Sequence, residues 1–271
     1  MKRVIALCLS FSLCFFLFAC GKSDAVIAAE EAIAAIGTVT IDSGDAIANA
    51  EKLYNILSDS EKQEVENRLI LVEAQEAFEQ AQIEFELMQA EQEQAKNEAI
   101  YNNAKHAFEL LKEASAICSY GMDAVYGAWY FGIYEAHDTY NSFFYNLSMN
   151  TPGLPSNSIE SAANKLGISE REAREDWNNC LNITLEAISQ RGDYMMLASY
   201  MAEAETTLQT LVDEYSDYTY YPKLKEYFSA VSSYAQFFIS PSGSFKQLAD
   251  TINNYENTIR TLESDVSFLF S

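Results

Sequence analysis

Few residues of this chain could bind a metal or act in catalysis. Two of its 271 residues are histidines, His106 and His137. A catalytic zinc site usually has three protein ligands, often with histidines four residues apart on one helix, and di-iron bundles use Glu-x-x-His pairs. Neither spacing occurs, since Asn103 and Tyr134 stand three residues before the histidines. The sequence therefore predicts no metal site, no cofactor and no catalytic residues, and we expect no enzymatic activity.

Cysteine is the other reactive residue type, and the chain has 5 cysteines. Cys8 and Cys14 lie in an apolar N-terminal run, and Cys20 follows that run. Cys118 and Cys180 each fall on an apolar helical stripe. In an oxidising compartment these two could form a disulfide, and otherwise each would behave as a small buried hydrophobic residue. The sequence leaves both interpretations open.

Aromatic residues are concentrated in the second half of the chain, where 15 of the 17 tyrosines lie between Tyr120 and Tyr255. Rings at helical spacing usually form a core, with the tyrosine hydroxyls at its surface. The alternative is an aromatic-lined groove that binds a glycan, a peptide or an apolar ligand. The first candidates for such a groove are Trp129, Tyr130, Tyr134, Trp177 and Tyr221.

The N-terminus has the pattern of an export signal. Lys2 and Arg3 precede an uncharged apolar run, residues 4–18, and polar residues follow Ala19 and Cys20. A charged start, a short apolar region and a small residue at the cleavage point are typical of a secretory signal. The run is also shorter than the roughly 20 residues that a transmembrane helix needs.

The last residues of this run resemble the lipobox of bacterial lipoproteins, in the order Leu17-Phe18-Ala19-Cys20. The resemblance implies cleavage before Cys20 and attachment of lipid to its sulfur. An ordinary signal peptide with a chance cysteine and an uncleaved anchor are the alternatives. We expect a signal peptide over residues 1–19, a lipidated tether over residues 20–24, and a location on the extracytoplasmic face of the bacterial cell membrane. The acyl chains would provide stable anchoring.

The charge of the chain argues against nucleic-acid partners. Its formal net charge is −23, and removal of residues 1–19 would take away two basic residues and no acid, giving −25. A field of this sign repels nucleic acid and anionic lipid head groups. The expected partners are the membrane, through the lipid, and an envelope protein or glycan whose identity the sequence does not give.

The composition, with 4 prolines and 10 glycines, favours an all-α fold. Residues 25–75 are expected to form a small helical module, in which Gly37 ends the first helix and an extended segment, residues 38–41, follows. Asp42 or Ser43 would cap the second helix. Ser58 and Glu61 fit a capping box that opens the third.

This module resembles a helical repeat of Gram-positive cell-surface and cell-wall proteins. The resemblance covers about residues 26–75 and rests on residues 36–40, 50–58, 65–67 and 71–74. It implies a small spacer or interaction module and brings no catalytic residues with it.

Residues 76–271 are expected to form an elongated antiparallel bundle with long, coiled-coil-like helices. From Leu71 to Ala99 small and apolar residues recur at steps of three and four, and their many alanines favour an intramolecular hairpin over a parallel zipper. The stripe continues to Leu147, with Gly121, Gly127 and Gly132 as expected kinks. A turn over residues 150–158 follows, then a short helix ending at Gly167. Next come a long helix from a capping box at Ser169 to about Tyr215, a helix with Pro222 in its first turn, and a last helix over residues 245–270.

The sequence thus predicts a membrane-anchored lipoprotein that acts as a non-enzymatic surface interaction or spacer protein. The alternative is a lipoprotein that captures a ligand in an aromatic-lined helical groove.

Overall fold

The computed structural model describes residues 21–138, 142–215 and 221–270. These residues form helices and no strands, so the predicted all-α helical bundle is confirmed. The chain divides into two compact units, unit 1 (Met1–Ala95) and unit 2 (Lys96–Ser271). One helix, α5 (Arg68–Tyr134), contributes residues to both units.

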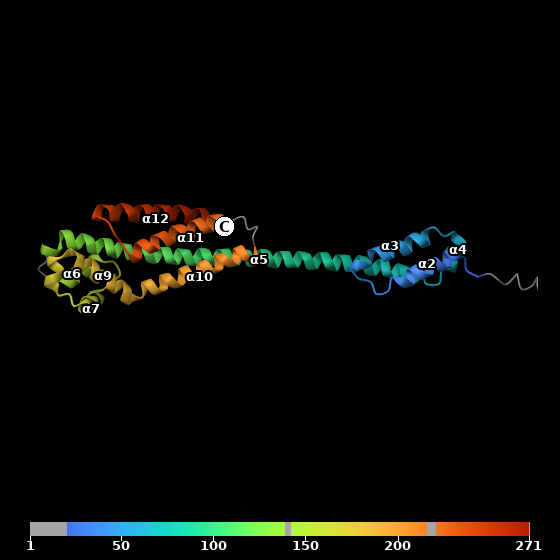
Figure 1. Ribbon diagram of the computed structural model, residues 1–271, viewed down its shortest axis with the longest axis horizontal. Helices are drawn as coiled ribbons and strands as arrows, with labels where there is room; N and C mark the ends of the chain where they lie inside the picture. Colours follow the sequence, from blue (N-terminus) through green and yellow to red (C-terminus); the bar gives the residue numbers. More distant parts are fainter. Residues whose placement is uncertain (1–20, 139–141, 216–220, 271) are drawn as a thin grey trace, which may run out of the picture. The chain divides into compact units, whose positions relative to one another are not determined.

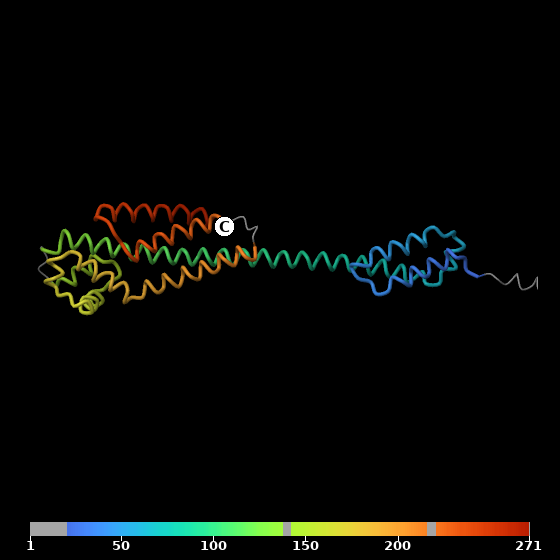
Figure 2. Tube along the Cα trace, viewed as in Figure 1, coloured from blue at the N-terminus to red at the C-terminus, as the bar shows by residue number. Residues whose placement is uncertain are grey.

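The described part of unit 1, residues 21–95, contains three short helices and the start of α5 (Figure 2). The helices are α2 (Asp24–Ala35), α3 (Gly44–Asn55) and α4 (Asp59–Glu64), with a 3-10 turn, η1 (Ile41–Ser43), before α3. Gly37 follows α2 with φ of 63°, as expected of a residue that ends a helix. Within the expected extended segment, residues 38–41, Thr40 has an extended backbone, and Ile41 already begins η1.

The capping box predicted at α4 is present. The Ser58 hydroxyl accepts from the Glu61 backbone N–H at 3.4 Å, and the Glu61 carboxylate accepts from the Ser58 backbone N–H at 3.0 Å. Two backbone donors at the helix start are therefore satisfied within the segment itself. The helices enclose a core of aliphatic side chains and alanines: Val26, Ala29, Ile33, Ile36, Ile47, Ala50, Leu57, Val65, Leu71 and Ala74.

The middle of α5 belongs to neither core. Residues 82–98 are all exposed, including Phe85 and Met88 of the predicted stripe. No described helix covers this stripe, so the predicted hairpin is wrong over this segment. Its side chains are mainly Glu, Gln and Ala, which give a helix high intrinsic propensity without requiring a packing partner.

The C-terminal part of α5 is the central helix of unit 2, and it ends at Tyr134 rather than continuing to Leu147. A 3-10 turn, η2 (Ala136–Asp138), and a separate helix, α6 (Phe143–Asn150), follow. The glycines of α5 permit close packing: a Cβ on Gly127 would lie 1.7 Å from the Asn150 carbonyl oxygen, and one on Gly121 would lie 2.2 Å from the Phe238 ring. They are contact points of the bundle.

The helix predicted from Ser169 to Tyr215 is instead three helices, α8 (Glu170–Glu175), α9 (Trp177–Arg191) and α10 (Asp193–Glu214). Asp176 is extended and its carboxylate caps α9, while Gly192 adopts φ of 92° between α9 and α10. These two residues interrupt the helix because neither conformation continues an α-helix. The capping box at Ser169 is present, as predicted.

The remaining helices of unit 2 are α7 (Ser156–Leu166), α11 (Tyr221–Ile239) and α12 (Phe245–Ser267), followed by η3 (Phe268–Phe270). Pro222 is in the first turn of α11, as predicted. Figure 1 shows α10, α11 and α12 lying along α5, with α6, α7 and α9 gathered near its C-terminal end. The large buried side chains include several aromatics: Phe108, Trp129, Phe131, Phe143, Tyr227, Tyr234 and Phe238.

Candidate functional site

The two tryptophans of the chain stack on each other in unit 2. Trp129 of α5 and Trp177 of α9 have ring centroids 5.1 Å apart and planes 13° from parallel. Trp177 is the first residue of α9, and the Asp176 carboxylate accepts from the Asn178 N–H at 3.0 Å. Gly132 permits this approach, because a Cβ there would lie 3.0 Å from the Trp177 Cβ. The local cap and the glycine together place Trp177 against α5.

A second aromatic group lies on the neighbouring face of α5. Tyr130 and Tyr134 are one helical turn apart, with ring centroids at 5.1 Å. Phe245, the first residue of α12, has its ring centroid 6.3 Å from that of Tyr130 and 5.9 Å from that of Tyr134. The same ring stacks on Tyr126 at 4.9 Å. Phe245 was not predicted from the sequence as a site residue, although the turn before it was.

An open pocket of about 420 Å³ joins the Trp pair to the start of α12. Its apolar surface comes from Trp129, Ile133, Trp177 and Phe245. Its polar groups come from His137 and Glu175, and Gly132, Gly243 and Ser244 complete the lining. We call this the aromatic pocket. It combines flat apolar rings with an imidazole and a carboxylate, which is a set of groups able to bind a ligand with an apolar face and polar edges.

The short 3-10 turn that carries His137 is held by a residue of α8. The Arg174 guanidinium donates to the Ala136 carbonyl oxygen at 3.2 Å and lies 4.9 Å from the centre of the Phe143 ring. This contact fixes η2 against the bundle, and so positions the histidine at the pocket.

The structure brings four of the five predicted groove residues together and leaves one apart. Trp129 and Trp177 line the pocket, and Tyr130 and Tyr134 pack beside it through Phe245. Tyr221 is the first residue of α11, whereas the pocket is formed beyond the other end of that helix. Tyr221 therefore does not line the aromatic pocket, and its ring packs against the main core.

A second cavity of about 370 Å³ lies between α5 and α12. Its charged lining has both signs, Lys112 and Arg260 against Glu113, Glu256 and Glu263. Glu256 Oε1 accepts from the Ser119 hydroxyl at 2.6 Å and from the Tyr234 hydroxyl at 3.4 Å. Burial, assisted by the Glu256 charge, raises the pKa of the adjacent Asp123. The lining is an ordinary mixed-charge helix interface, with its main carboxylate already hydrogen-bonded.

Cys118 and Cys180 are free and buried. The sequence left open a disulfide between them or two buried free thiols, and in the structure they are buried free thiols. Burial raises the pKa of each thiol to about 12. The Cys180 Sγ also lies 3.6 Å from the Ala173 carbonyl oxygen, as a weak donor. Both thiols remain protonated at neutral pH and contribute to packing.

The predicted lipidation residue, Cys20, lies outside the described residues. Across the described ranges, no group of three or more His, Cys, Asp or Glu side chains is arranged to hold a metal ion. No helix among those same residues is both long and apolar enough to cross a bilayer.

No family model, curated protein sequence or solved structure matches this chain.

Proposed function

We propose that the chain is a non-enzymatic lipoprotein, anchored through Cys20 to the extracytoplasmic face of a bacterial membrane, in which unit 2 is presented for interaction with an envelope component. Residues 17–20 support the anchor through their resemblance to a lipobox. The observation that carries the presenting role is the exposed helical segment 82–98, which connects two units that each have their own core.

The segment is suited to this role by its composition. Its exposed Glu and Gln side chains are well hydrated, and Gln80, two residues before it, donates to the Glu84 carboxylate at 3.0 Å. A connection that only joined two domains could be a short loop, since most connections in compact proteins have a few residues. The 17 exposed helical residues, 82–98, support a spacer role instead.

Two variants test this proposal in cells. Cys20→Ala should release the protein or leave its precursor uncut, as measured by fractionation and by mass spectrometry of the N-terminus. Deletion of residues 84–90, one heptad, should leave lipidation and both cores intact and reduce the access of an antibody to an epitope tag on unit 2. Membrane retention and normal processing of Cys20→Ala would contradict the anchor. Unchanged access in the deletion variant would contradict the spacer.

The aromatic pocket favours a second candidate function, capture of a neutral sugar ring. The apolar face of a pyranose matches the half-buried rings of Trp177 and Phe245, behind which Trp129 is buried, and its hydroxyl groups can bond to His137 and Glu175. The negative charge of the chain disfavours anionic glycans.

A glycan array probed with the soluble chain, followed by titration of tryptophan emission, tests this second candidate. Trp177→Ala should abolish binding, while Tyr221→Ala, which removes an aromatic ring away from the pocket, should retain it. Equal loss in the two variants would assign the effect to general destabilisation, and no glycan response in the unaltered chain would rule out this function.

A further inference from the structure

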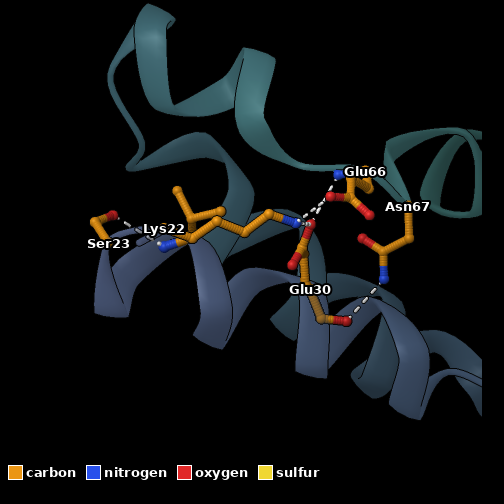
Figure 3. Close-up of polar contacts among 6 residues, drawn as sticks. Lys22, Ser23, Glu30, Glu66 and Asn67 are labelled. Atoms are coloured by element: carbon orange, nitrogen blue, oxygen red, sulfur yellow. Dashed lines mark hydrogen bonds and ion pairs between the residues drawn. The ribbon is translucent and has the colours of Figure 1, made fainter. Parts of the chain in front are cut away.

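Lys22 and Ser23, near the start of the described chain, are bound to the surface of unit 1 by side-chain contacts. The Lys22 ammonium lies 2.6 Å from Glu30 Oε1 and 2.9 Å from Glu66 Oε1 (Figure 3). The same Glu30 oxygen accepts from the Glu66 backbone N–H at 2.8 Å. One residue further on, the Ser23 hydroxyl donates to Glu61 Oε1 at 2.9 Å and accepts from the Val26 N–H. These bonds tie the chain to α2, to α4 and to the turn before α5.

Because of this attachment, little free chain separates the proposed anchor from the folded unit. Cys20 precedes Lys22 by two residues, which span about 7 Å at most when extended. Lipid on Cys20, which is part of the proposed function, would therefore hold this part of unit 1 at the head groups. A long flexible tether would impose no such restriction.

The same end of unit 1 exposes large aliphatic side chains. Ile56 is 70% exposed, Leu69 is 65% exposed and Ile70 is 48% exposed. Ile56 follows α3 and stands two residues before Ser58, which caps α4. Leu69 and Ile70 follow Asn67, whose amide donates to the Glu30 carbonyl oxygen at 2.8 Å. Figure 1 shows the C-terminal end of α3, all of α4 and the starts of α2 and α5 at one end of the unit.

Other aliphatic residues of unit 1, such as Leu87, are also exposed, but Ile56, Leu69 and Ile70 are the ones at the end where Lys22 and Ser23 are bound. If Cys20 carries lipid, the surface nearest to these residues is the bilayer that holds the lipid. We propose that Ile56, Leu69 and Ile70 form a lipid-contacting face, and that they enter the head-group region of that bilayer.

The charges at this end specify the kind of lipid surface. At this end the acidic residues Asp59, Glu61, Glu64, Glu30 and Glu66 outnumber the basic residues Lys62, Lys22 and Arg68. Acidic side chains at a bilayer surface are repelled by anionic head groups and are indifferent to zwitterionic ones. Insertion should therefore be deeper on a zwitterionic surface, and salt should weaken the difference between the two surfaces.

Tryptophan scanning can test the proposed face, because both native tryptophans lie in unit 2. The purified full-length lipoprotein, with lipid on Cys20 verified by mass spectrometry, is reconstituted into phosphatidylcholine vesicles that carry brominated acyl chains. Ile56→Trp and Leu69→Trp place reporters on the face. Leu87→Trp is the matched control, since Leu87 is 59% exposed and lies on the order of 25 Å along α5 from Ile70.

Both face reporters should show blue-shifted and quenched emission beyond the native background, and Leu87→Trp should match that background. Vesicles containing phosphatidylglycerol should reduce the quenching. Lipidated protein without quenching at residues 56 and 69, or with equal quenching at residue 87, would overturn the inference and leave the anchor intact. A precursor without lipid on Cys20 would overturn the proposed function, and this inference with it.

Discussion

Units 1 and 2 are both helical, but they bury different chemical groups. Among the described residues, the core of unit 1 consists of aliphatic side chains and alanines. The core of unit 2 includes phenylalanines, two tyrosines, a tryptophan and two cysteine thiols. Unit 1 has no ionisable group in its described core, so the pH dependence of its stability comes from surface carboxylates. In unit 2 the buried phenols and thiols must stay protonated, so high pH lowers the stability of that unit. The two units should therefore fail at opposite ends of the pH scale.

The largest expected effect is alkaline destabilisation of unit 2. Burial raises the pKa of Cys118 and of Cys180 from 9.0 to about 12, and it also raises the pKa of Tyr227 and of Tyr234. The folded state binds more protons than the unfolded state above pH 9, so stability falls as the pH rises through this window. Each buried thiol should contribute about 1.4 kcal/mol per pH unit.

Urea unfolding followed by tryptophan emission measures this loss, since Trp129 and Trp177 both report on unit 2. The double variant Cys118→Ala/Cys180→Ala should have a shallower alkaline slope. An unchanged slope in that variant would show that the thiols do not titrate with unfolding.

A matched pair of glycine substitutions compares how closely the units are packed. Gly127→Ala in unit 2 should cost about 3 kcal/mol, because its Cβ would lie 1.7 Å from a backbone oxygen that cannot move alone. Gly44→Ala in unit 1 should cost little, because its Cβ would lie 3.0 Å from the end of the half-buried Phe78 ring, which can rotate away. Thermal unfolding by circular dichroism and tryptophan emission separates the units. Equal losses of stability in the two variants would contradict the expected difference in packing between the units.

The two capping boxes allow a comparison in which the motif is constant and the unit differs. Ser58→Ala and Ser169→Ala should each cost about 1 kcal/mol, since each removes the same hydroxyl acceptor. The melting temperature should fall more for Ser58→Ala, because the same energy shifts the midpoint of a smaller unit further. Calorimetry of both variants gives the two shifts. Equal shifts would indicate that the units unfold together, and a larger shift for Ser169→Ala would contradict the prediction.

The smallest effect expected is acid sensitivity in unit 1. The hydrogen bond from Lys22, assisted by the Glu66 N–H, lowers the pKa of Glu30 below 4.5. The folded state therefore favours the charged carboxylate, and this stabilisation is present above about pH 4.5 and lost as the pH falls through the folded value. Glu30→Gln should flatten the acid limb of unit 1 in circular dichroism. Glu31→Gln, which removes a neighbouring exposed charge outside the network, should leave it unchanged.

Sequence patterns that act over a few residues predicted the structure well. Ser58 with Glu61, Ser169 with Glu172, Gly37 and Gly167 each mark a helix end through bonds or backbone conformations that are complete within one turn. The long-range features were harder to predict. The stripe through Phe85 and Met88 has a coiled-coil period, yet period alone does not reveal whether a partner helix exists.

In the candidate site, too, local features were predictable and long-range contacts were not. Trp129 and Trp177 were predicted as site residues from their type, but 48 positions separate them, and only the cap at Asp176 and the close approach at Gly132 bring them together. Phe245 was missed because a single phenylalanine at a helix start is ordinary, and its role depends on where the turn before α12 places it. Tyr221 lies apart from the aromatic pocket, and tyrosine clustering in sequence does not identify which rings share a surface.

The exposed stretch of α5 also determines how the protein can be cut. Between Arg68 and Lys105 it offers trypsin a single basic residue, Lys96, and it offers a glutamate-specific protease several acids between residues 84 and 98. Local fraying of this helix would disturb no buried contact, so cleavage there requires little unfolding. One cut would leave both cores whole and shed unit 2 from a stub that still carries the proposed lipid.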